Sequence, residues 1–350
     1  MAKVTRIGLD IAKNVFEVHG VNQAGTAVLR RTIARGKLRE FFAKLPPCLV
    51  GMEACGSAHY WARELGKLGH QVRLMAAQFV NAYRKSGKND ANDAMAICEA
   101  VGRPNMRFVP IKSEEQQALL MVHRARDLMV QSRTAQVNQI RGLLGEFGVV
   151  VAQGVDRLQR ALPDILEDAE NGLPYLARQT LSTLVEQLHY LNEQVQHYDR
   201  QIGQLARQSE VVQRLMRMPG VGPITATAFA AAVGNAREFA NGRQFAAWLG
   251  LTPRQHSSGG KTWLGSITKR GDVYLRRLLV HGARAVLRTA AERADTKSRW
   301  AKRLQARRGA NIAAVALAAK HARIIWALLA KGVDFQSDLP SNAVPSEAAG

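Results

Sequence analysis

The chain has 350 residues, of which 47% are hydrophobic, enough for about two or three globular domains with packed cores. Its net charge is +21 and its sequence pI is about 10.6. Folding does not require that excess, so it indicates an anionic partner, most often a nucleic acid and less often an acidic membrane surface. The cysteines Cys48, Cys55 and Cys98 form no C-x-x-C pair, which argues against a disulfide framework and a structural zinc site.

The N-terminus, MAKVTRIGLD, has no apolar stretch of the signal-peptide kind, and no run of about 18 apolar residues occurs along the chain. We therefore expect a cytoplasmic protein that does not span a membrane. The cysteine usage fits a reducing compartment.

Short apolar runs separated by turn residues predict a β-meander over residues 4–31. A fourth strand over 48–54, a helix over 57–69 capped by Ser57, and a fifth strand over 71–77 follow. A meander followed by alternating helices and strands predicts a mixed α/β sheet.

From Ser113 the sequence becomes helical. Ser113 and Gln116 have the spacing of a capping box, and the helix should run to about Gly145. This helix is rich in arginine: Arg124, Arg126, Arg133 and Arg141.

The next segment has a regular apolar stripe in steps of three and four, which is typical of a and d heptad positions. Its members are Leu181, Leu184, Leu188, Leu191, Val195, Tyr198, Ile202 and Leu205. An antiparallel hairpin or an intermolecular coiled coil is favoured, because the stripe is narrow and its flanks are polar. One helix of a bundle is the alternative.

The C-terminal third is predicted to be helical with Gly-rich breaks and strongly basic. The fold class is therefore α/β followed by mostly α. The expected regions are an α/β domain (1–112), a long helix and coiled-coil region (113–210), a C-terminal helical domain (211–335) and a disordered tail (336–350).

Four acidic residues stand out from the basic background. Asp10 interrupts IGLDIAK and Glu53 interrupts VGMEACG, where buried strands should stay apolar. Burying a carboxylate there is costly without a partner or a metal. Asp90 and Asp93 lie three apart at a helix start, so both can face one way. Taken singly, Asp10 could be a turn residue, Glu53 an exposed side chain and Asp90 an N-cap; the four together favour a shared site.

Such a set is what a two-metal nucleotidyl-transfer site needs. Mg²⁺ prefers oxygen ligands, and paired ions can activate the attacking oxygen and stabilise the leaving one in a phosphodiester displacement. We expect two Mg²⁺ ions, or one ion plus substrate. Strands one and four are neighbours in an RNase H-like sheet, which would bring Asp10 beside Glu53.

Three segments carry a resemblance to a known family: GLDIAKNVFEV, MEACGSAHYWARELGKLGHQVRLM and KNDANDAMAICEA. They resemble the RuvC-like domain of insertion-sequence-110 family transposases, more closely the insertion-sequence-1111 branch, which is related to the pilin-gene invertase. The resemblance implies an RNase H-like fold whose DEDD set coordinates Mg²⁺. In this sequence that set is Asp10, Glu53, Asp90 and Asp93.

The segment MPGVGPITATAFAAAVG (218–234) places Gly220 and Gly222 on either side of Val221, before a helix. Amides at that helix start could hold a phosphate. The segment resembles one helix-hairpin-helix DNA-binding element, although a plain helix–turn–helix connection would look similar.

Residues 245–279 place small, polar and basic residues in a Gly-rich loop before a basic helix, which on composition alone is a surface loop. The stretch resembles the family's C-terminal transposase domain, in which the serine of an SG pair is the nucleophile. That serine aligns with Ser258; Ser257 and Ser266 are the local competitors, and His256 is a candidate base. Cations that could stabilise the developing charge lie close in sequence: Arg254, Lys261, Lys269 and Arg270. These four, together with Arg276 and Arg277, are also expected to contact nucleic acid.

The resemblance covers about residues 4–335 and implies a recombinase that joins DNA through a covalent serine–DNA intermediate. At least some family members are guided by a structured noncoding (bridge) RNA. The arginines of the long helix would suit phosphate contacts with such an RNA, and a solvated helix face is the alternative. Two distant motifs imply a composite active site, and we expect a homo-oligomer, a dimer or a tetramer, in which the site could be built across subunits.

Three other functions remain open at this point. A junction-resolving nuclease would need only the acids, with water as the nucleophile. A non-catalytic nucleic-acid-binding protein would explain the charge and the glycine turn but not the four carboxylates. A DNA invertase of the same family is a close variant of the recombinase.

Overall fold

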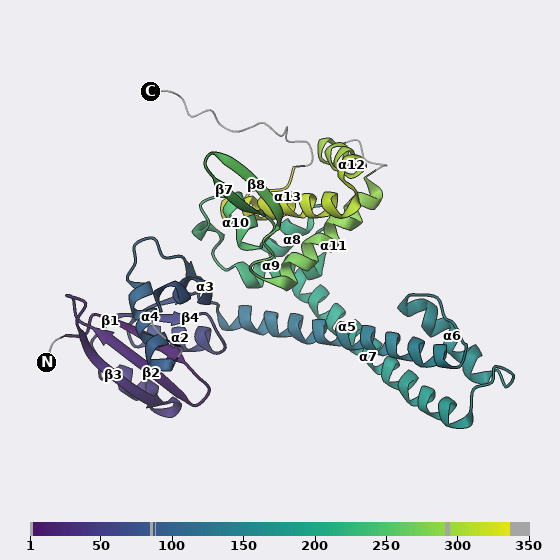
Figure 1. The fold of residues 1–350 in the computed structure, drawn as a ribbon, viewed down its shortest axis with the longest axis horizontal. Helices are drawn as coiled ribbons and strands as arrows, with labels where there is room; N and C mark the ends of the chain where they lie inside the picture. Colours follow the sequence, from purple (N-terminus) through teal and green to yellow (C-terminus); the bar gives the residue numbers. More distant parts are fainter. Residues whose placement is uncertain (1–2, 85–86, 88, 291–294, 337–350) are drawn as a thin grey trace. The chain divides into compact units, whose positions relative to one another are not determined.

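The structure is a computed structural model that describes residues 3–84, 87, 89–290 and 295–336. The chain forms two compact units, Met1–Glu114 and Glu115–Gly350, and each is described by itself (Figure 1). The predicted tail over 336–350 lies outside the described residues, apart from Gln336.

The first unit contains a six-stranded sheet in the order β3-β2-β1-β4-β5-β6. The first three strands form an antiparallel meander, β4 and β5 run parallel to β1, and β6 is antiparallel to β5. The five predicted strands are confirmed, whereas β6 is too short to show a pattern. The strands are β1 Arg6–Ile11, β2 Val15–Val21, β3 Ala27–Ala34, β4 Leu49–Glu53, β5 Gln71–Met75 and β6 Phe108–Val109.

Helices α1 (Leu38–Ala43) and α2 (Ala58–Lys67) contribute to an apolar core with residues such as Ile7 and Leu9 of β1. The predicted helix over 57–69 is confirmed. Its expected cap is wrong: Ser57 has a left-handed backbone (φ 66°) and makes no side-chain capping bond.

Helix α4 (Asp90–Val101) packs against β1, β2 and β4, and two glycines allow its close approach. Gly8 and Gly51 are paired in the register of β1 and β4. A Cβ on Gly8 would lie 2.1 Å from the Ala94 carbonyl oxygen, and one on Gly51 would lie 2.6 Å from the Val101 Cβ. Because Gly8 and Gly51 have no side chain, α4 can pack directly against the backbone of β1 and β4.

The second unit begins with the long helix α5 (Glu114–Glu146), close to the predicted bounds, which pairs with α7 (Tyr175–Arg207). Helix α6 (Val155–Glu167) shares an apolar cluster with the last turns of α5 and the first turns of α7. Residues further along α5 contact residues earlier in α7, so the two helices are antiparallel. The contacts join Arg126 to Asp199, Arg133 to Asn192, and Gln136 to the Leu184 carbonyl.

The predicted apolar stripe lies on α7, and every member is buried or half-buried. Leu181 and Leu188 pack with Ile140 and Leu144 of α5 and with Leu158 of α6. The stripe is therefore buried inside one chain, as an antiparallel hairpin, and it no longer argues for contact with a second subunit.

The rest of the second unit is a helical domain around one core cluster. Its helices are α8 Glu210–Met216, α9 Pro223–Val233, α10 Gly242–Trp248, α11 Val273–Thr289, α12 Thr296–Arg308 and α13 Ala310–Lys331. By length and composition, α13 is the one helix of the described residues that could cross a membrane. It packs against α10, α11 and α12 and contributes Leu317, Ile325 and Leu328 to the core, so we assign it to the core.

A buried histidine joins α5 to this helical domain. His123 is 1% exposed; its Nδ1 lies 3.0 Å from the Tyr274 hydroxyl of α11, and its Nε2 lies 3.0 Å from Thr227 Oγ1 of α9. Because the Thr227 hydroxyl donates to the Pro223 carbonyl, Nε2 carries the proton and Nδ1 accepts from the tyrosine. Burial lowers the pKa of His123 to about 4, so the imidazole is neutral near pH 7.

Candidate active site

The backbone brings Asp10 and Glu53 together at one edge of the sheet. Gly8 pairs with Gly51 and Leu9 with Met52 in parallel strands, so Asp10 and Glu53 follow side by side at the next position. Residues two apart on a strand share a face, so both carboxylates lie on the face that the glycines open to α4.

Helix α4 supplies the other two acids from its first turn. Its N-cap is Asn89, whose side-chain oxygen accepts a bond of 2.8 Å from the Asn92 amide. Asp90 is therefore the first helical residue, and its interpretation as an N-cap is wrong. Asp93 forms an ion pair of 3.3 Å with Arg84, so one acid is already held by a cation.

Electrostatics couple the four acids. The pKa of Asp10 is raised from 3.8 to about 6, first by burial and then by the negative charges of Asp90, Asp93 and Glu53. Three carboxylates from β4 and α4 thus act on a fourth on β1. Like charges that gather at a half-buried edge disfavour one another's ionised form, and a bound cation would relieve that repulsion.

The donor chemistry fits a hard cation, because all four side chains offer carboxylate oxygens. Among the described residues, no group of three or more acidic, histidine or cysteine side chains stands at ligand distance. Charge coupling acts over longer distances than ligation, so the two findings agree. The acids share one edge, and their side chains must turn inward to coordinate a metal ion.

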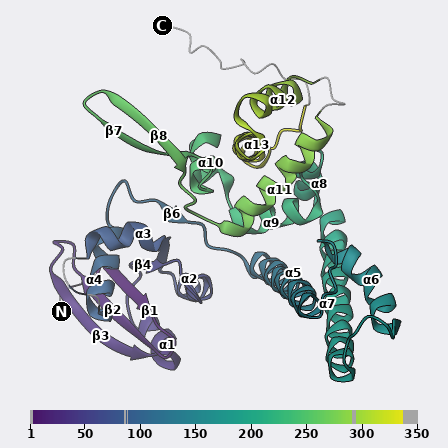
Figure 2. The same ribbon diagram turned by 45° about the vertical axis from the view of Figure 1, so that its right-hand side comes forward.

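Ser258 lies at the tip of a β-hairpin that projects from the second unit (Figure 2). The hairpin comprises β7 (Pro253–Ser258) and β8 (Lys261–Ile267), whereas the sequence interpretation expected a Gly-rich loop. Gly259 and Gly260 form the turn with φ of 54° and 77°. Two positive φ angles match the tight hairpin turns that glycine permits.

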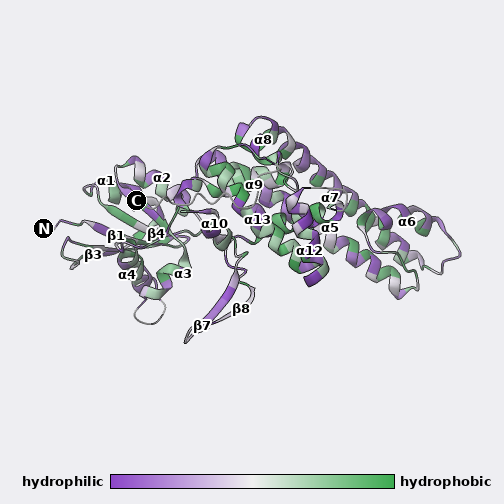
Figure 3. Ribbon diagram, turned by 90° about the horizontal axis from the view of Figure 1, so that it is seen from above, coloured by the Kyte–Doolittle hydropathy of each residue, from purple (hydrophilic) through white to green (hydrophobic). Residues whose placement is uncertain are grey.

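Nearly the whole hairpin is exposed, and β7 is strongly hydrophilic (Figure 3). The Ser258 hydroxyl makes no hydrogen bond within the described residues, whereas Ser257 accepts one of 2.8 Å from Gln255 Nε2. His256 lies two positions before Ser258, on the same face of the strand. It pairs with Trp263 of β8 and makes no hydrogen bond with Ser258 in this state. Ser266, the other competitor, is exposed on β8.

The base of the hairpin is held by the side chain of Arg276 and by close backbone packing. Arg276 donates from Nη1 to the carbonyl oxygens of Leu249 and Arg270, each at 3.0 Å. A Cβ on Gly250 would lie 2.1 Å from the Arg270 carbonyl oxygen. The hairpin therefore has a hydrogen-bonded base and an exposed tip, and Arg276, expected to contact nucleic acid, is bonded within that base.

Several other arginines predicted to contact nucleic acid have partners inside the protein. Arg126 pairs with Asp199, Arg133 donates to Asn192, and Arg277 pairs with Asp127. Arg141 donates from Nε to the Val151 carbonyl oxygen at 3.1 Å. These side chains position helices, and a phosphate would have to compete with their present partners.

The remaining predicted cations are exposed and have no side-chain partner within the described part of the chain. They are Arg124 on α5, Arg254 and Lys261 on the hairpin, and Lys269 and Arg270 after it. Exposed, unpaired cations are the kind that phosphate contacts use.

The glycine turn between α8 and α9 is closely packed. Gly220 has φ of 81°, and a Cβ there would lie 2.7 Å from the Gly282 carbonyl oxygen of α11. Gly222 precedes α9 as its N-cap, and a Cβ there would meet open space. Gly220 is therefore needed for packing, and only Gly222 leaves room for a ligand.

Two family models match the chain. The transposase IS116/IS110/IS902 family matches residues 212–299, and a transposase model named for the DEDD residues of the IS110 group matches residues 7–148. The first match includes the hairpin and the second includes all four acids.

Close relatives cover nearly the whole chain. A probable family 20 transposase of Pseudomonas aeruginosa is 54% identical over 94% of this chain and 97% of its own length. The transposase for insertion sequence element IS1111A of Coxiella burnetii is 44% identical over 95% of this chain and 91% of its own length. That for IS1328 of Yersinia enterocolitica is 41% identical over 96% and 99%.

The chain therefore belongs to the IS110/IS116 family of insertion-sequence transposases, and the resemblance to its insertion-sequence-1111 members is confirmed. Membership implies that the protein binds DNA and that it cuts and rejoins DNA strands.

Proposed function

We propose that this transposase cuts and rejoins DNA with a metal-binding acid centre, formed by Asp10, Glu53, Asp90 and Asp93, and a nucleophilic serine, Ser258. The carrying observation is that four acids gather at one half-buried edge, where burial first and then the charges of the other three raise the pKa of Asp10 to about 6. Repulsion of this kind destabilises the protein unless a cation or a proton offsets it.

The acid centre belongs to an RNase H-like, RuvC-like domain over residues 1–112. The strand order β3-β2-β1-β4-β5, with the acids at the ends of β1 and β4, supports this assignment. Mg²⁺ held there, as two ions or as one ion plus substrate, would offset charge that develops on the phosphate. The carboxylates bind the metal only when ionised, which links metal affinity to their pKa values.

Ser258 forms the covalent intermediate in this scheme. Its Oγ attacks the phosphorus of a phosphodiester, an Oγ–P bond forms, and the P–O bond to one deoxyribose oxygen breaks. The Oγ proton leaves to a base, for which His256 is the candidate, and the released deoxyribose oxygen takes up a proton. Attack by a deoxyribose hydroxyl on the same phosphorus reverses the step and releases serine. The exposed tip of the hairpin supports this role, because an attacking hydroxyl must reach a phosphate.

The C-terminal domain (211–335) and the helices before it (113–210) would hold the nucleic acid. Exposed cations support contacts through Arg124, Arg254, Lys261, Lys269 and Arg270. Gly222 at the start of α9 supports a helix-hairpin-helix contact with a phosphate. A structured noncoding guide RNA remains part of the proposal, and the basic surface is compatible with it.

A homo-oligomer, a dimer or a tetramer, would allow the acids and the serine to come from different chains. Support comes from an apolar patch at the end of the α5–α7 hairpin, which surrounds a cavity of about 310 Å³. Phe147, Tyr175 and Leu176 are exposed in this region, and large exposed apolar patches often mark interfaces.

The test is a covalent adduct. Wild-type protein, Mg²⁺, DNA carrying the element ends and RNA from the flank are combined, and denaturing gels detect DNA attached to protein. We expect an adduct that disappears in Ser258→Ala and in Asp10→Asn and persists in Ser266→Ala.

A junction-resolving nuclease is the second candidate, because the acid centre alone would suffice for attack by water. In that case Mg²⁺-dependent cleavage would continue in Ser258→Ala, with no adduct in any variant. DNA binding that is indifferent to Asp10→Asn and Ser258→Ala, without cleavage, would leave only a binding protein.

A further inference from the structure

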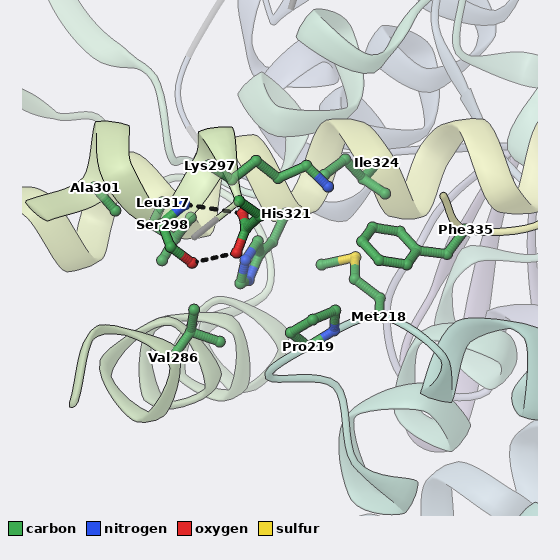
Figure 4. Close-up of a pocket in the computed structure, with 11 residues that line it drawn as sticks. Met218, Pro219, Val286, Lys297, Ser298, Ala301, Leu317, His321, Ile324 and Phe335 are labelled. Atoms are coloured by element: carbon green, nitrogen blue, oxygen red, sulfur yellow. Dashed lines mark hydrogen bonds between the residues drawn. The ribbon is translucent and has the colours of Figure 1, made fainter. Parts of the chain in front are cut away.

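Helix α12 (Thr296–Arg308) carries an exposed basic stripe that lies outside the site described above. Its inward side is apolar or small: Ser298 and Ala301 are buried and line a cavity of about 90 Å³, together with residues of α11 and α13 (Figure 4). The outward residues are cationic. They are Arg299, Lys302, Arg303, Arg307 and Arg308, all exposed.

The packing beneath this helix fixes its orientation. Asp295 is the N-cap: it accepts bonds of 3.0 Å from the Ser298 amide and 2.7 Å from the Ser298 hydroxyl (Figure 4). Trp300 is half-buried, and Lys320 of α13 lies 4.7 Å from its ring centre. The outward side is therefore held toward solvent by contacts on the opposite side.

Folding does not account for the stripe. Arg299, Arg303 and Arg307 follow one another at intervals of four, and like charges at that spacing repel and destabilise a helix. The helix dipole favours cations only in the last turn, which covers Arg307 but not Arg299 or Arg303. The helix contains no acidic residue, and these arginines have no side-chain partner among the described residues.

We infer that α12 is a second DNA-binding surface, which contacts the phosphate backbone of duplex DNA and does not recognise its bases. The stripe from Arg299 to Arg307 spans roughly 12 Å at about 1.5 Å per residue. Duplex DNA carries one phosphate about every 3.4 Å along each strand, so the stripe can face about three phosphates of one strand.

The chemistry of the stripe favours duplex DNA over a single strand. Proteins that hold single strands stack the bases on exposed aromatic rings. The one aromatic residue of α12, Trp300, is half-buried beneath Lys320, so the outward side offers charge alone. This inference rests on the proposed DNA substrate, and it adds a surface that the serine hairpin does not include.

The test measures binding of a nonspecific DNA duplex, an RNA duplex and a DNA single strand of equal length by fluorescence anisotropy over a range of salt concentrations. The variant is Arg299→Gln with Arg303→Gln, and the matched control is Arg157→Gln with Arg160→Gln on α6. Arg157 and Arg160 are also exposed, but α6 contains three acidic residues as well: Asp156, Asp164 and Glu167.

For the α12 variant we expect affinity at low salt to fall about tenfold or more, and the slope of log K against log salt to shrink by about two, one per contact. The α6 control should keep the wild-type slope. Arg299→Lys with Arg303→Lys should restore the slope, because it keeps both charges. Melting curves that match wild type show that the variants are folded.

An unchanged slope in the α12 variant would overturn the inference, and so would an equal change in the α6 control. A loss confined to RNA duplexes or to single strands would assign the stripe to another ligand. The outcome is separable from the proposed function: a missing Ser258 adduct with intact α12-dependent binding would reject the chemistry alone.

Discussion

The acid centre and the serine hairpin are built in opposite ways. The acids lie on a packed sheet and on α4, which packs directly against the strands because Gly8 and Gly51 have no side chains. Ser258 lies on two exposed strands that pair with each other and are held to the helical domain at their base. The packed fold therefore determines where the acids lie, whereas Ser258 makes no side-chain contact that would fix its position within the described residues.

This difference predicts where mutations act. Changes under the acids should disturb the fold and the chemistry together. Changes at the hairpin tip should disturb the chemistry alone, because an exposed residue contributes little to stability.

The largest effect is expected from Gly8→Ala. The new Cβ would lie 2.1 Å from the Ala94 carbonyl oxygen, so α4 must move away from the sheet and take Asp90 and Asp93 with it. Overpacking against a backbone should cost about 3 kcal/mol of unfolding free energy, and adduct formation should fall about a hundredfold.

Chemical denaturation and the adduct yield check this prediction. Gly66→Ala in α2 is the control, because its Cβ meets open space and should raise stability by about 0.4–1 kcal/mol. A Gly8→Ala protein with wild-type stability would refute the tight contact between α4 and the sheet.

The second effect concerns pH and belongs to the other unit. The pKa of His123 is lowered from 6.5 to about 4 in the folded protein, so the unfolded chain binds a proton first as the pH falls. The stabilisation that this shift contributes is fully present above about pH 6.5 and is lost as the pH falls toward 4. Between pH 7.5 and pH 5 the contribution of His123 to the unfolding free energy should fall by about 2 kcal/mol.

Urea unfolding of the second unit at the two pH values measures this loss. His123→Gln should reduce it by most of that amount, while His189→Gln, at an exposed position of α7, should leave it unchanged. His321 also has a pKa lowered to about 4 by burial, and it contributes equally to all three proteins. An equal loss in His123→Gln would show that His123 is not buried in its neutral form.

The third effect has the opposite sign and belongs to the acid centre. The Asp10 pKa is raised above its ordinary value, so its ionised form destabilises the folded state as the pH rises through about 6. In chelator at pH 7.5, Asp10→Asn should therefore be more stable than wild type, by about 1–2 kcal/mol after solvent screening.

Mg²⁺ should stabilise the wild type and leave Asp10→Asn nearly unaffected, because only an ionised set of acids binds it. Thermal unfolding with and without Mg²⁺ provides the comparison. An Asp10→Asn protein that is less stable than wild type in chelator would mean that the acids do not repel one another.

The smallest effect separates two arginines near the hairpin. Arg276→Gln loses bonds to two backbone carbonyls and should cost about 1–2 kcal/mol. Arg254→Gln, on the exposed strand, should leave stability within about 0.5 kcal/mol and reduce DNA binding. A reversed pattern in unfolding and binding assays would exchange their assigned roles.

The elements that repeat a simple pattern were predictable from the sequence. The first five strands follow from short apolar runs between turn residues, and the stripe on α7 follows from its three-and-four spacing. Asp10 and Glu53 stood out because a carboxylate is unexpected in a buried strand. Their proximity to Asp90 and Asp93 depends on the close packing of α4 against Gly8 and Gly51. The sequence does not reveal that these two glycines lie opposite each other in neighbouring strands.

The hairpin and the paired arginines were less predictable. The two glycines after Ser258 are a hairpin signal, but the polar strands around them hide the alternation that strands usually show. Arg126, Arg133 and Arg277 read as free cations, because their partners lie far away along the chain. Only tertiary structure distinguishes an arginine that holds a helix from one that meets solvent.

The most direct test of the account is to locate the DNA attachment in the trapped adduct. Protease digestion and tandem mass spectrometry of the wild-type complex should find a nucleotide on Ser258, at the hairpin tip, with Mg²⁺ required for its formation. A nucleotide on Ser257 or Ser266, or strand cleavage that leaves no serine modified, would contradict the central claim.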